Sequence, residues 1–371
     1  MEVIKYIKEH GFDKLTEELG IKVKDYPEHN LVVLNYCQID SPKTHPVVRE
    51  CRGLILQKDT LQILCRPFDR FFNAGEAPET VEDFDITKAI AYEKIDGSLI
   101  KVWFNPMTNW WEIATRGTAF AESPVNGFDL TFRDLVHRAV GVSSHEEFDQ
   151  HVRMHLCKNT SYMFEVTATE NRVVRRYEGT QLWFLGAREI ATGYDLTDST
   201  DVCAQVSKLN VKFPEKFQFD TLDHALHASK QLKNLDEGYV LFDVESHKRI
   251  KVKSPAYVAV HHIRGEGLNP KRIKELVLTN EQDEYLQYFP EDTDLVTPYV
   301  LKLALLESNM VEAYEMHRGA LDQKEFALGV KDFCFSGILF NARKENKEVV
   351  DIWANAPDNM KYKIFSNFVG E

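Results

Sequence analysis

The chain has 371 residues, with 45 Lys or Arg against 58 Asp or Glu, and a formal net charge of −13. This charge argues against a protein that coats nucleic acid non-specifically, because such binding depends on neutralised phosphates. No apolar run approaches the roughly 18 to 20 residues that span a bilayer, so we expect neither a membrane span nor a signal peptide. Six scattered cysteines without C-x-x-C or zinc-like spacing suit a reducing cytoplasm.

The length favours two domains, and the residue pattern changes near residue 254. Before it, short apolar runs alternate with a few helical segments, which is typical of an α+β fold with mainly antiparallel sheets. The predicted strands are 31–34, 53–56, 63–66, 89–93, 99–104, 111–115, 161–168, 181–188, 238–244 and 249–253, and the predicted helices are 128–140, 146–156 and 221–232.

After residue 254 the pattern is helical. Asn269-Pro270 and Thr297-Pro298 are each typical of an N-cap followed by the first helical residue. An apolar stripe at helical spacing follows at Val300, Leu303, Leu306, Met310 and Ala313. We therefore predict two domains, 1–254 and an all-helical 255–371.

The first candidate functional segments are Glu50-Cys51-Arg52-Gly53 and Lys94-Ile95-Asp96-Gly97-Ser98. The Arg52 guanidinium could bind a phosphate or carboxylate bidentately, or form a surface ion pair. Strands 89–93 and 99–104 flank the second segment, so we predict that it forms the turn of a hairpin. Lys94 could then be a covalent nucleophile on the same face as Asp96, while Gly97 lets a phosphate approach the backbone.

Three later segments also combine charge with a predicted strand. Glu165 stands inside an apolar run, which is costly unless the carboxylate is paired, binds metal or faces a cleft. Glu237 and Gly238 lead into the strand 238–244, an arrangement that is also common in turns. Lys251 and Lys253 alternate with apolar residues and share one face, as they would on a functional strand or on a solvated edge strand.

Taken in order, these segments resemble the motif series of the covalent nucleotidyltransferases, the superfamily of ATP-dependent ligases and mRNA capping enzymes. The resemblance is greatest to the RNA ligase 1 family of T-even bacteriophages, the tRNA-repair ligases. It extends from residue 30 to residue 290, and further matching segments are Arg66-Pro67, Phe71-Phe72-Asn73, Thr169-Glu170-Asn171-Arg172, Arg188-Glu189, Thr192-Gly193 and Tyr257-Val258.

The resemblance implies an ATP-dependent RNA ligase that joins 5′-phosphate and 3′-hydroxyl ends through a lysyl-AMP and an RNA-adenylate, in tRNA repair. Residues 1–254 would be an adenylyltransferase domain with an ATP-grasp-like antiparallel sheet, and residues 255–371 a possible RNA-specificity module. Its partners would be single-stranded RNA or tRNA ends, and it would act as a monomer in the cytoplasm, a host cytoplasm if phage-encoded.

The resemblance also assigns individual residues. It implies the catalytic residues Lys94, Glu165 and Tyr257, and Mg²⁺ or Mn²⁺ ligands at Asp283, Glu165 and Glu237. The implied ATP contacts are Tyr36, Arg52, Arg70, Asp96, Gly97, Arg116, Glu237, Lys251 and Lys253.

Two departures from the family pattern stand out. Arg70 and Arg116 replace lysines, which keeps the charge but changes a compact ammonium into a planar fork. An ATP-contacting tyrosine of the family aligns with Leu34 or Asn35, although Tyr36 is adjacent.

Elementary chemistry supports the nucleophile. A lysine amine attacks only when neutral, so its pKa must fall from about 10.4, and we expect the nearby cations Lys251, Lys253 and Arg52, together with partial burial, to lower it. The same cations would stabilise negative charge on the phosphates. The glutamates would supply hard oxygen ligands, which suit Mg²⁺ or Mn²⁺ better than zinc.

Three alternatives stay open. A capping guanylyltransferase or a DNA ligase would share the lysyl-nucleotide step, but both usually carry an OB-type barrel after the Lys-x-Lys strand, where this sequence is helical. A non-catalytic RNA-end-binding protein could dispense with Lys94, and a Lys94→Ala substitution would leave its RNA affinity unchanged.

Overall fold

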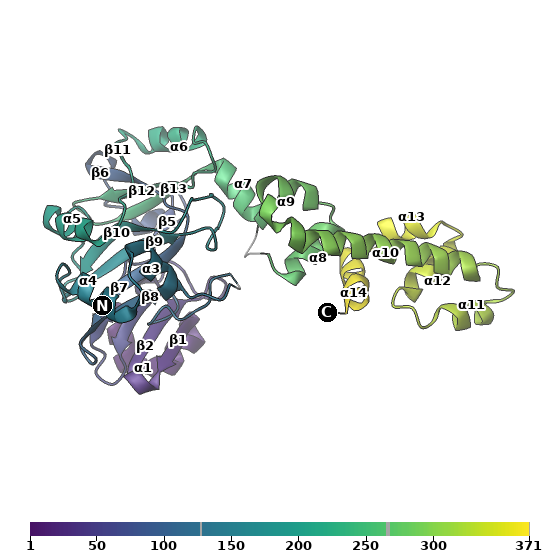
Figure 1. Cartoon of the computed structure of the whole chain (residues 1–371), viewed down its shortest axis with the longest axis horizontal. Coiled ribbons are helices and arrows are strands. Elements are labelled where there is room, and N and C mark those ends of the chain that lie inside the picture. Colours follow the sequence, from purple (N-terminus) through teal and green to yellow (C-terminus); the bar gives the residue numbers. More distant parts are fainter. Residues whose placement is uncertain (127, 265–267, 371) are drawn as a thin grey trace. The chain divides into compact units, whose positions relative to one another are not determined.

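The computed structural model describes residues 1–126, 128–264 and 268–370, and it divides into two compact units, Met1–His261 and His262–Glu371 (Figure 1). The first unit contains three sheets with helices packed on them. The second is built from helices in its described part. The predicted α+β fold with antiparallel sheets and a helical C-terminal region is confirmed.

The first sheet has the order β1-β2-β3-β4 and is antiparallel throughout. Its strands are β1 (Ile21–Tyr26), β2 (Leu31–Tyr36), β3 (Arg52–Gln57) and β4 (Ile63–Cys65). Period-2 geometry divides β2 between two cores: Val32 and Leu34 pack with helix α1 (Glu2–Leu19) and helix α2 (Pro46–Glu50), whereas Leu31 and Val33 pack toward the second sheet.

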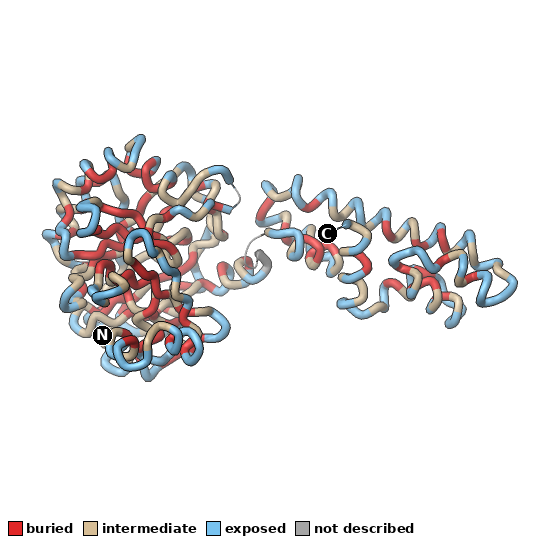
Figure 2. The backbone as a smooth tube through the Cα atoms, turned by 90° about the horizontal axis from the view of Figure 1, so that it is seen from below, coloured by how far each residue is buried: buried red, intermediate tan, exposed pale blue. Residues whose placement is uncertain are grey.

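The second sheet has the order β10-β9-β7-β8. Its strands are β7 (Ser98–Asn105), β8 (Trp110–Thr115), β9 (Thr160–Thr167) and β10 (Gln181–Glu189). Helices α3 (Phe132–Val140), α4 (His145–Arg153) and α5 (Thr200–Val206) contribute to the apolar core on this sheet. Buried stretches of chain run through the interior of this unit in Figure 2.

The third sheet has the order β11-β6-β12-β13-β5. Its strands are β5 (Phe72–Asn73), β6 (Ala89–Glu93), β11 (Lys216–Phe217), β12 (Gly238–Asp243) and β13 (Arg249–Lys253), and helix α6 (Leu222–Lys230) packs on it. The β13–β5 pair is parallel and the other pairs are antiparallel. Short 3₁₀ turns are η1 (Pro27–His29), η2 (Pro78–Thr80), η3 (Ile86–Lys88), η4 (Ser207–Leu209) and η5 (Pro290–Asp292).

The predicted hairpin at Lys94–Ser98 is wrong. The strand before this segment, β6, pairs with β11 and β12 in the third sheet, and the strand after it, β7, pairs with β8 and β9 in the second. The segment therefore crosses from one sheet to the other. Local turn chemistry suggested a hairpin, but long-range pairing with β12 and β9 outweighs it.

Helix α7 (Pro255–Arg264) follows β13 directly, and the second unit contains seven further described helices. These are α8 (Pro270–Leu278), α9 (Gln282–Tyr288), α10 (Thr293–His317), α11 (Gln323–Val330), α12 (Ser336–Glu345), α13 (Val349–Ala354) and α14 (Asp358–Val369). Leu306, Met310 and Ala313 of the predicted stripe are buried in its core, whereas Val300 and Leu303 are half-buried. Among the described helices, none combines the length and apolarity needed to cross a membrane.

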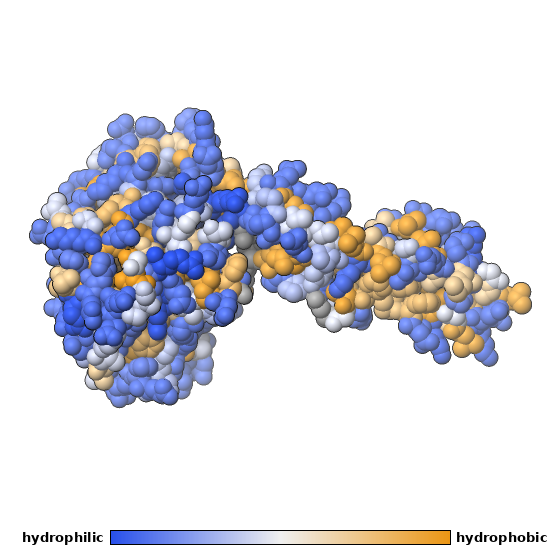
Figure 3. Space-filling model, viewed as in Figure 1, coloured by the Kyte–Doolittle hydropathy of each residue, from blue (hydrophilic) through white to orange (hydrophobic). Residues whose placement is uncertain are grey.

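One predicted helix start in this unit is confirmed and one is wrong. The Asn269 side chain accepts a hydrogen bond from the Arg272 amide at the start of α8. Pro298 lies inside α10, which already begins at Thr293, so the missing proline amide removes one helical hydrogen bond near the helix start. Apolar side chains also lie on the surface of the unit (Figure 3), and the exposed ones include Leu301 and Leu305.

Candidate active site

Lys94 lies at the end of β6, where the chain leaves the third sheet. Its amide donates to the Gly238 carbonyl at 2.9 Å, and its Nζ lies 2.6 Å from Glu237 Oε2. Backbone and side chain are thus both attached to the start of β12. Glu237 is only 4% exposed, so this ion pair is largely removed from solvent.

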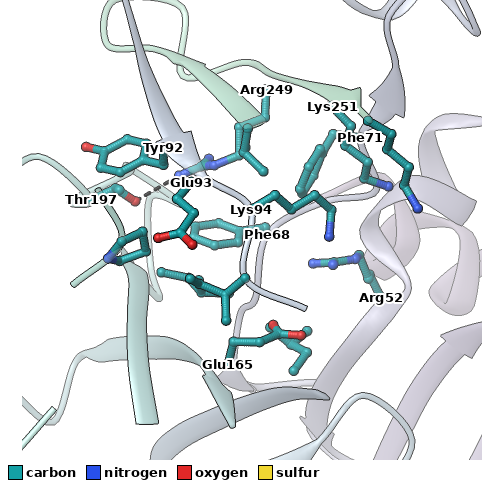
Figure 4. Close-up of a pocket in the computed structure, with 16 residues that line it drawn as sticks. Arg52, Phe68, Phe71, Tyr92, Glu93, Lys94, Glu165, Thr197, Arg249 and Lys251 are labelled. Atoms are coloured by element: carbon teal, nitrogen blue, oxygen red, sulfur yellow. Dashed lines mark hydrogen bonds between the residues drawn. The ribbon is translucent and has the colours of Figure 1, made fainter. Parts of the chain in front are cut away.

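Lys94 lines a pocket in the first unit together with Arg52, Phe71, Glu165 and Lys251 (Figure 4). The empty space between the lining residues, open solvent included, is about 820 Å³. The ends of Lys94 and Arg52 face one another in Figure 4. The structure therefore brings the predicted nucleophile, arginine, strand glutamate and Lys-x-Lys strand together.

The two lysines of β13 have different environments. Lys253 Nζ lies 3.1 Å from Glu237 Oε1, so one carboxylate holds both Lys94 and Lys253. Lys251 forms no ion pair among the described residues, and its Nζ lies 4.7 Å from the centroid of the Phe71 ring. Burial and the nearby charges of Arg52 and Lys94 lower the pKa of Lys251 to about 6.

This distribution corrects the expectation that the cations lower the pKa of Lys94. Burial does act in that direction, but the charges of Glu237 and Glu165 outweigh it, and the pKa of Lys94 is raised. Among the lysines that line the pocket, Lys251 is the one whose pKa is lowered, because burial and the charges of Arg52 and Lys94 act on it and no carboxylate pairs with it among the described residues. In the protein without ligand, the predicted nucleophile Lys94 is therefore an ammonium held by Glu237.

Glu165 stands on β9 and lines the same pocket. No hydrogen bond to its carboxylate is present among the described residues. Burial and the neighbouring Glu237 charge raise the pKa of Glu165 to about 8, although Lys94 acts in the opposite direction. A half-buried carboxylate that accepts no hydrogen bond from the described residues fits a cation, and Mg²⁺ is commonly held by one or two carboxylates together with substrate phosphates.

The described residues contain no cluster of three or more His, Cys, Asp or Glu side chains that could hold a metal by themselves. Asp283, the third predicted metal ligand, is exposed on α9 in the second unit, and it stays a prediction.

Asp96 is buried and fully occupied by hydrogen bonds. Its Oδ2 accepts from the amides of Val174 at 2.8 Å and Arg175 at 2.7 Å, and its Oδ1 accepts from the Tyr257 hydroxyl at 2.6 Å. Tyr257, predicted as catalytic, thus holds Asp96 in place from α7. Burial and the Glu237 charge raise the pKa of Asp96 against these donors.

Gly97 allows the crossing segment to lie against β9. An added Cβ would stand 2.4 Å from the Val166 carbonyl oxygen, closer than any side chain tolerates. The glycine is therefore required by packing on the second sheet, in addition to any contact with a ligand.

The remaining predicted contacts form an aromatic and arginine group beside the pocket. The guanidinium carbons of Arg70 and Arg116 lie 4.7 and 5.5 Å from the centroid of the Tyr36 ring. Burial acts to raise the pKa of the Tyr36 hydroxyl, but the charges of Arg52, Arg116 and Arg70 outweigh it and lower that pKa. Stacking on a ring suits a planar guanidinium, which is consistent with arginine at positions 70 and 116.

The pocket also includes residues whose place in the site the motifs did not indicate, chiefly Phe68, Phe71 and Arg249. The guanidinium carbon of Arg249 lies 3.8 Å from the centroid of the Phe68 ring and 4.1 Å from that of the Phe242 ring. Its Nη1 lies 2.6 Å from Asp195 Oδ2. Phe71 belongs to the matching segment Phe71-Phe72-Asn73. The sequence therefore indicated this motif, but only the structure shows that its ring lies beside Lys251.

One pocket of the three-sheet unit thus brings together a half-buried lysine, a glutamate and several cations, and a second glutamate pairs with that lysine. The RNA ligase family profile matches residues 50–257 of this chain. A putative bifunctional polynucleotide kinase/RNA ligase of Autographa californica nuclear polyhedrosis virus is 34% identical over 81% of this chain and 43% of its own length.

The chain has lower sequence identity to two further RNA ligases. An RNA ligase of Rhodothermus phage RM378 is 25% identical over 64% of this chain and 65% of its own length. A Naegleria gruberi RNA ligase solved with PPi aligns with a TM-score of 0.40 and 17% identity over 53% of this chain and 58% of that one. The chain thus spans between two fifths and two thirds of the curated relatives named here.

The chain belongs to the RNA ligase family. The resemblance stated from the sequence is thereby confirmed at the level of the family.

Proposed function

We propose that this protein is an ATP-dependent RNA ligase that joins a 5′-phosphate to a 3′-hydroxyl through a lysyl-AMP intermediate. The observation that carries the proposal is the position of Lys94 Nζ, 2.6 Å from a buried carboxylate in a pocket that Arg52, Lys251 and Lys253 also line. A nucleophile, a base within hydrogen-bond reach and cations for phosphates are thus present together.

In the first step, Lys94 Nζ attacks the α-phosphorus of ATP. The N–P bond forms, the bond between the α-phosphorus and the bridging oxygen breaks, and its electron pair leaves with pyrophosphate. Glu237 Oε2 is the acceptor for the lysine proton, because it already contacts Nζ. Arg52, Lys251 and Lys253 bind the phosphates and stabilise the charge on the leaving group.

A divalent cation, Mg²⁺ or Mn²⁺, would be held by Glu165 and Glu237, and when bound it would neutralise charge on the phosphate oxygens. Asp283 is a further candidate ligand. Tyr36, Arg70, Asp96, Gly97 and Arg116 belong to the nucleotide site in this proposal, with Tyr257 positioning Asp96.

In the following steps the AMP passes from Lys94 to the 5′-phosphate of an RNA end, and the 3′-hydroxyl of a second end displaces AMP. Residues 1–254 act as the adenylyltransferase domain. Residues 255–371, which carry 13 basic and 19 acidic residues, act as a helical RNA-specificity module for particular ends such as those of a cleaved tRNA, because their charge does not suit general RNA binding.

The test is intact-mass and peptide mass analysis after incubation with ATP and Mg²⁺, followed by a chase with 5′-phosphorylated single-stranded RNA. We expect an AMP adduct on Lys94 that the RNA discharges, and no adduct in Lys94→Ala. A GMP adduct formed from GTP would indicate a capping guanylyltransferase, and discharge by nicked DNA alone a DNA ligase. No adduct on protein shown to be free of AMP, with RNA affinity unchanged in Lys94→Ala, would indicate a binding-only protein.

A further inference from the structure

A second pocket adjoins the Lys94 pocket within the first unit. Phe68, Phe71 and Arg249 line both pockets, whereas Lys94 and Glu165 line only the first. The second pocket is therefore separated from the reacting lysine by a shared wall of two phenylalanines and a fixed arginine.

The second pocket is basic in a chain whose net charge is −13. Its lining includes five basic side chains, those of Arg49, Arg70, Arg188, Lys248 and Arg249, and two acidic ones. Both acids are already paired: Asp69 lies 2.8 Å from Arg188, and Asp195 lies 2.6 Å from Arg249. Arg49 forms no ion pair among the described residues, and Arg70 has only a long one, 3.7 Å from Glu76.

Of these two arginines, Arg70 is the more buried and has a polar atom that no described residue satisfies. Its side chain is 9% exposed, and its nearest carboxylate, Glu76, is 3.7 Å away. Its Nε is buried and has no hydrogen-bond partner among the described residues. A buried charged donor without a partner is costly, so this guanidinium fits an anion from outside the chain.

Arg49 stands beside Arg70 on the rim. Its Nε donates to the Arg70 carbonyl at 3.4 Å, and it forms no ion pair within the described part of the chain. Lys248 pairs at 2.9 Å with Asp83, whose side chain is 81% exposed, so a stronger anion can replace that partner. Arg49 and Lys248, which the proposed function does not use, together with Arg70, which the pocket shares with the proposed nucleotide site, match the charge and geometry of a phosphate.

We propose that this second pocket binds a backbone phosphate of an RNA end, so that the terminal group of the same strand reaches Lys94 past the Phe68–Phe71 wall. The inference rests on the proposed function and adds an RNA subsite to it. Contacts to backbone phosphates position a nucleic acid without reading its sequence. The strand is the one that carries either the 5′-phosphate or the 3′-hydroxyl.

The experiment compares Arg49→Gln, Lys248→Gln and the double variant with Lys208→Gln, which removes an exposed lysine outside both pockets. Lys94 adenylylation by ATP is measured first. The concentration of 5′-phosphorylated single-stranded RNA that gives half-maximal discharge of the adduct is measured next, at several salt concentrations. Sealing of pre-adenylylated RNA to a 3′-hydroxyl strand forms a third arm.

We expect adenylylation rates within about twofold of the parent in all variants, and a half-maximal RNA concentration about tenfold higher for each pocket substitution, the scale of one charge-assisted contact. The slope of log affinity against log salt should fall by roughly 0.7 for each lost phosphate contact. Arg49→Lys should keep the slope. A defect confined to discharge assigns the 5′-phosphate strand, and one confined to sealing assigns the 3′-hydroxyl strand.

RNA dependence equal to that of Lys208→Gln in both discharge and sealing, in protein with an unchanged melting temperature, would overturn the proposal. Equal losses of adenylylation would also overturn it, because the pocket would then serve the phosphates of ATP. If the parent protein forms no adduct, the proposed function fails instead. Fluorescence anisotropy with the same RNA, on the parent and the pocket variants, then tests whether the second pocket binds RNA.

Discussion

The Glu237 carboxylate holds Lys94 through Oε2 at 2.6 Å, and this pair joins two residues that are 143 positions apart in the chain. Its other oxygen lies 3.1 Å from Lys253. The proposed nucleophile is thus positioned by the residue at the start of β12, and the same carboxylate that orients the amine keeps it protonated in the absence of nucleotide.

Replacing Glu237 tests this relationship. In Glu237→Gln we expect the pKa of Lys94 to fall, because the largest charge that raises it is removed while burial still disfavours the ammonium. The measurement is the pH dependence of Lys94 acetylation, followed by peptide mass analysis with the exposed Lys208 as internal control. A midpoint for Lys94 that stays in place or moves to higher pH would contradict the ion-pair interpretation.

Lys251 makes the stability of the protein depend on pH. Its folded-state pKa of about 6 lies below the ordinary 10.5, so the unfolded chain binds a proton that the folded protein does not. The associated stability is present at pH above the ordinary pKa, is lost as pH falls, and reaches its minimum below about pH 6.

We therefore expect Lys251→Met to remove this loss. The free energy of unfolding of Lys251→Met minus that of the parent should increase between about pH 9 and about pH 6, by up to about 1.4 kcal/mol per pH unit. Urea unfolding at several pH values measures this, with Lys208→Met as the exposed control. An equal pH dependence in the parent and Lys251→Met would show that the Lys251 pKa is not lowered.

The Tyr257 hydroxyl supports Asp96, so its removal should cost stability. Tyr257→Phe leaves Asp96 Oδ1 buried without its 2.6 Å donor, and we expect a loss of about 1 to 3 kcal/mol in the free energy of unfolding. The backbone donors of Val174 and Arg175 keep the carboxylate in place. Tyr194→Phe, on a side chain that is 56% exposed, is the control and should change little; equal effects in both variants would remove the positioning role.

We expect Glu165 to make cation binding depend on pH. Because burial and Glu237 raise the pKa of Glu165 to about 8, a divalent cation has to displace a proton below that value. We expect the affinity for Mn²⁺, measured by calorimetry, to fall as pH decreases from about 8, by up to tenfold per unit for one proton.

Glu165→Gln should bind Mn²⁺ more weakly and lose most of this dependence. Exposed Glu146→Gln on α4 is the matched control. A parent protein whose Mn²⁺ affinity is constant between about pH 6 and pH 8 would exclude Glu165 as a ligand with a raised pKa.

Much of the first unit follows from local patterns. All ten predicted strands are present with small differences at their ends, because each is a short apolar run with a clear boundary. Strand β1 was missed, since its Lys22, Lys24 and Asp25 make it resemble a charged surface segment, as is common for a sheet edge. Helix α3 begins later than predicted, at Phe132, because Thr131 and Asp134 form a capping box there.

By itself, the sequence determined the residue types that surround the site: Lys94, Glu165, Glu237 and the two lysines of β13 were all identified from their motifs. The tertiary structure decided how they interact. Only the pairing of β6 with β12 and of β7 with β9 shows that the Lys94 segment crosses between sheets. Only burial and the surrounding charges show that Lys94 keeps its proton while Lys251 releases one. Residue types and their spacing are local properties, whereas pairing, burial and electrostatic fields depend on residues that are distant in the chain.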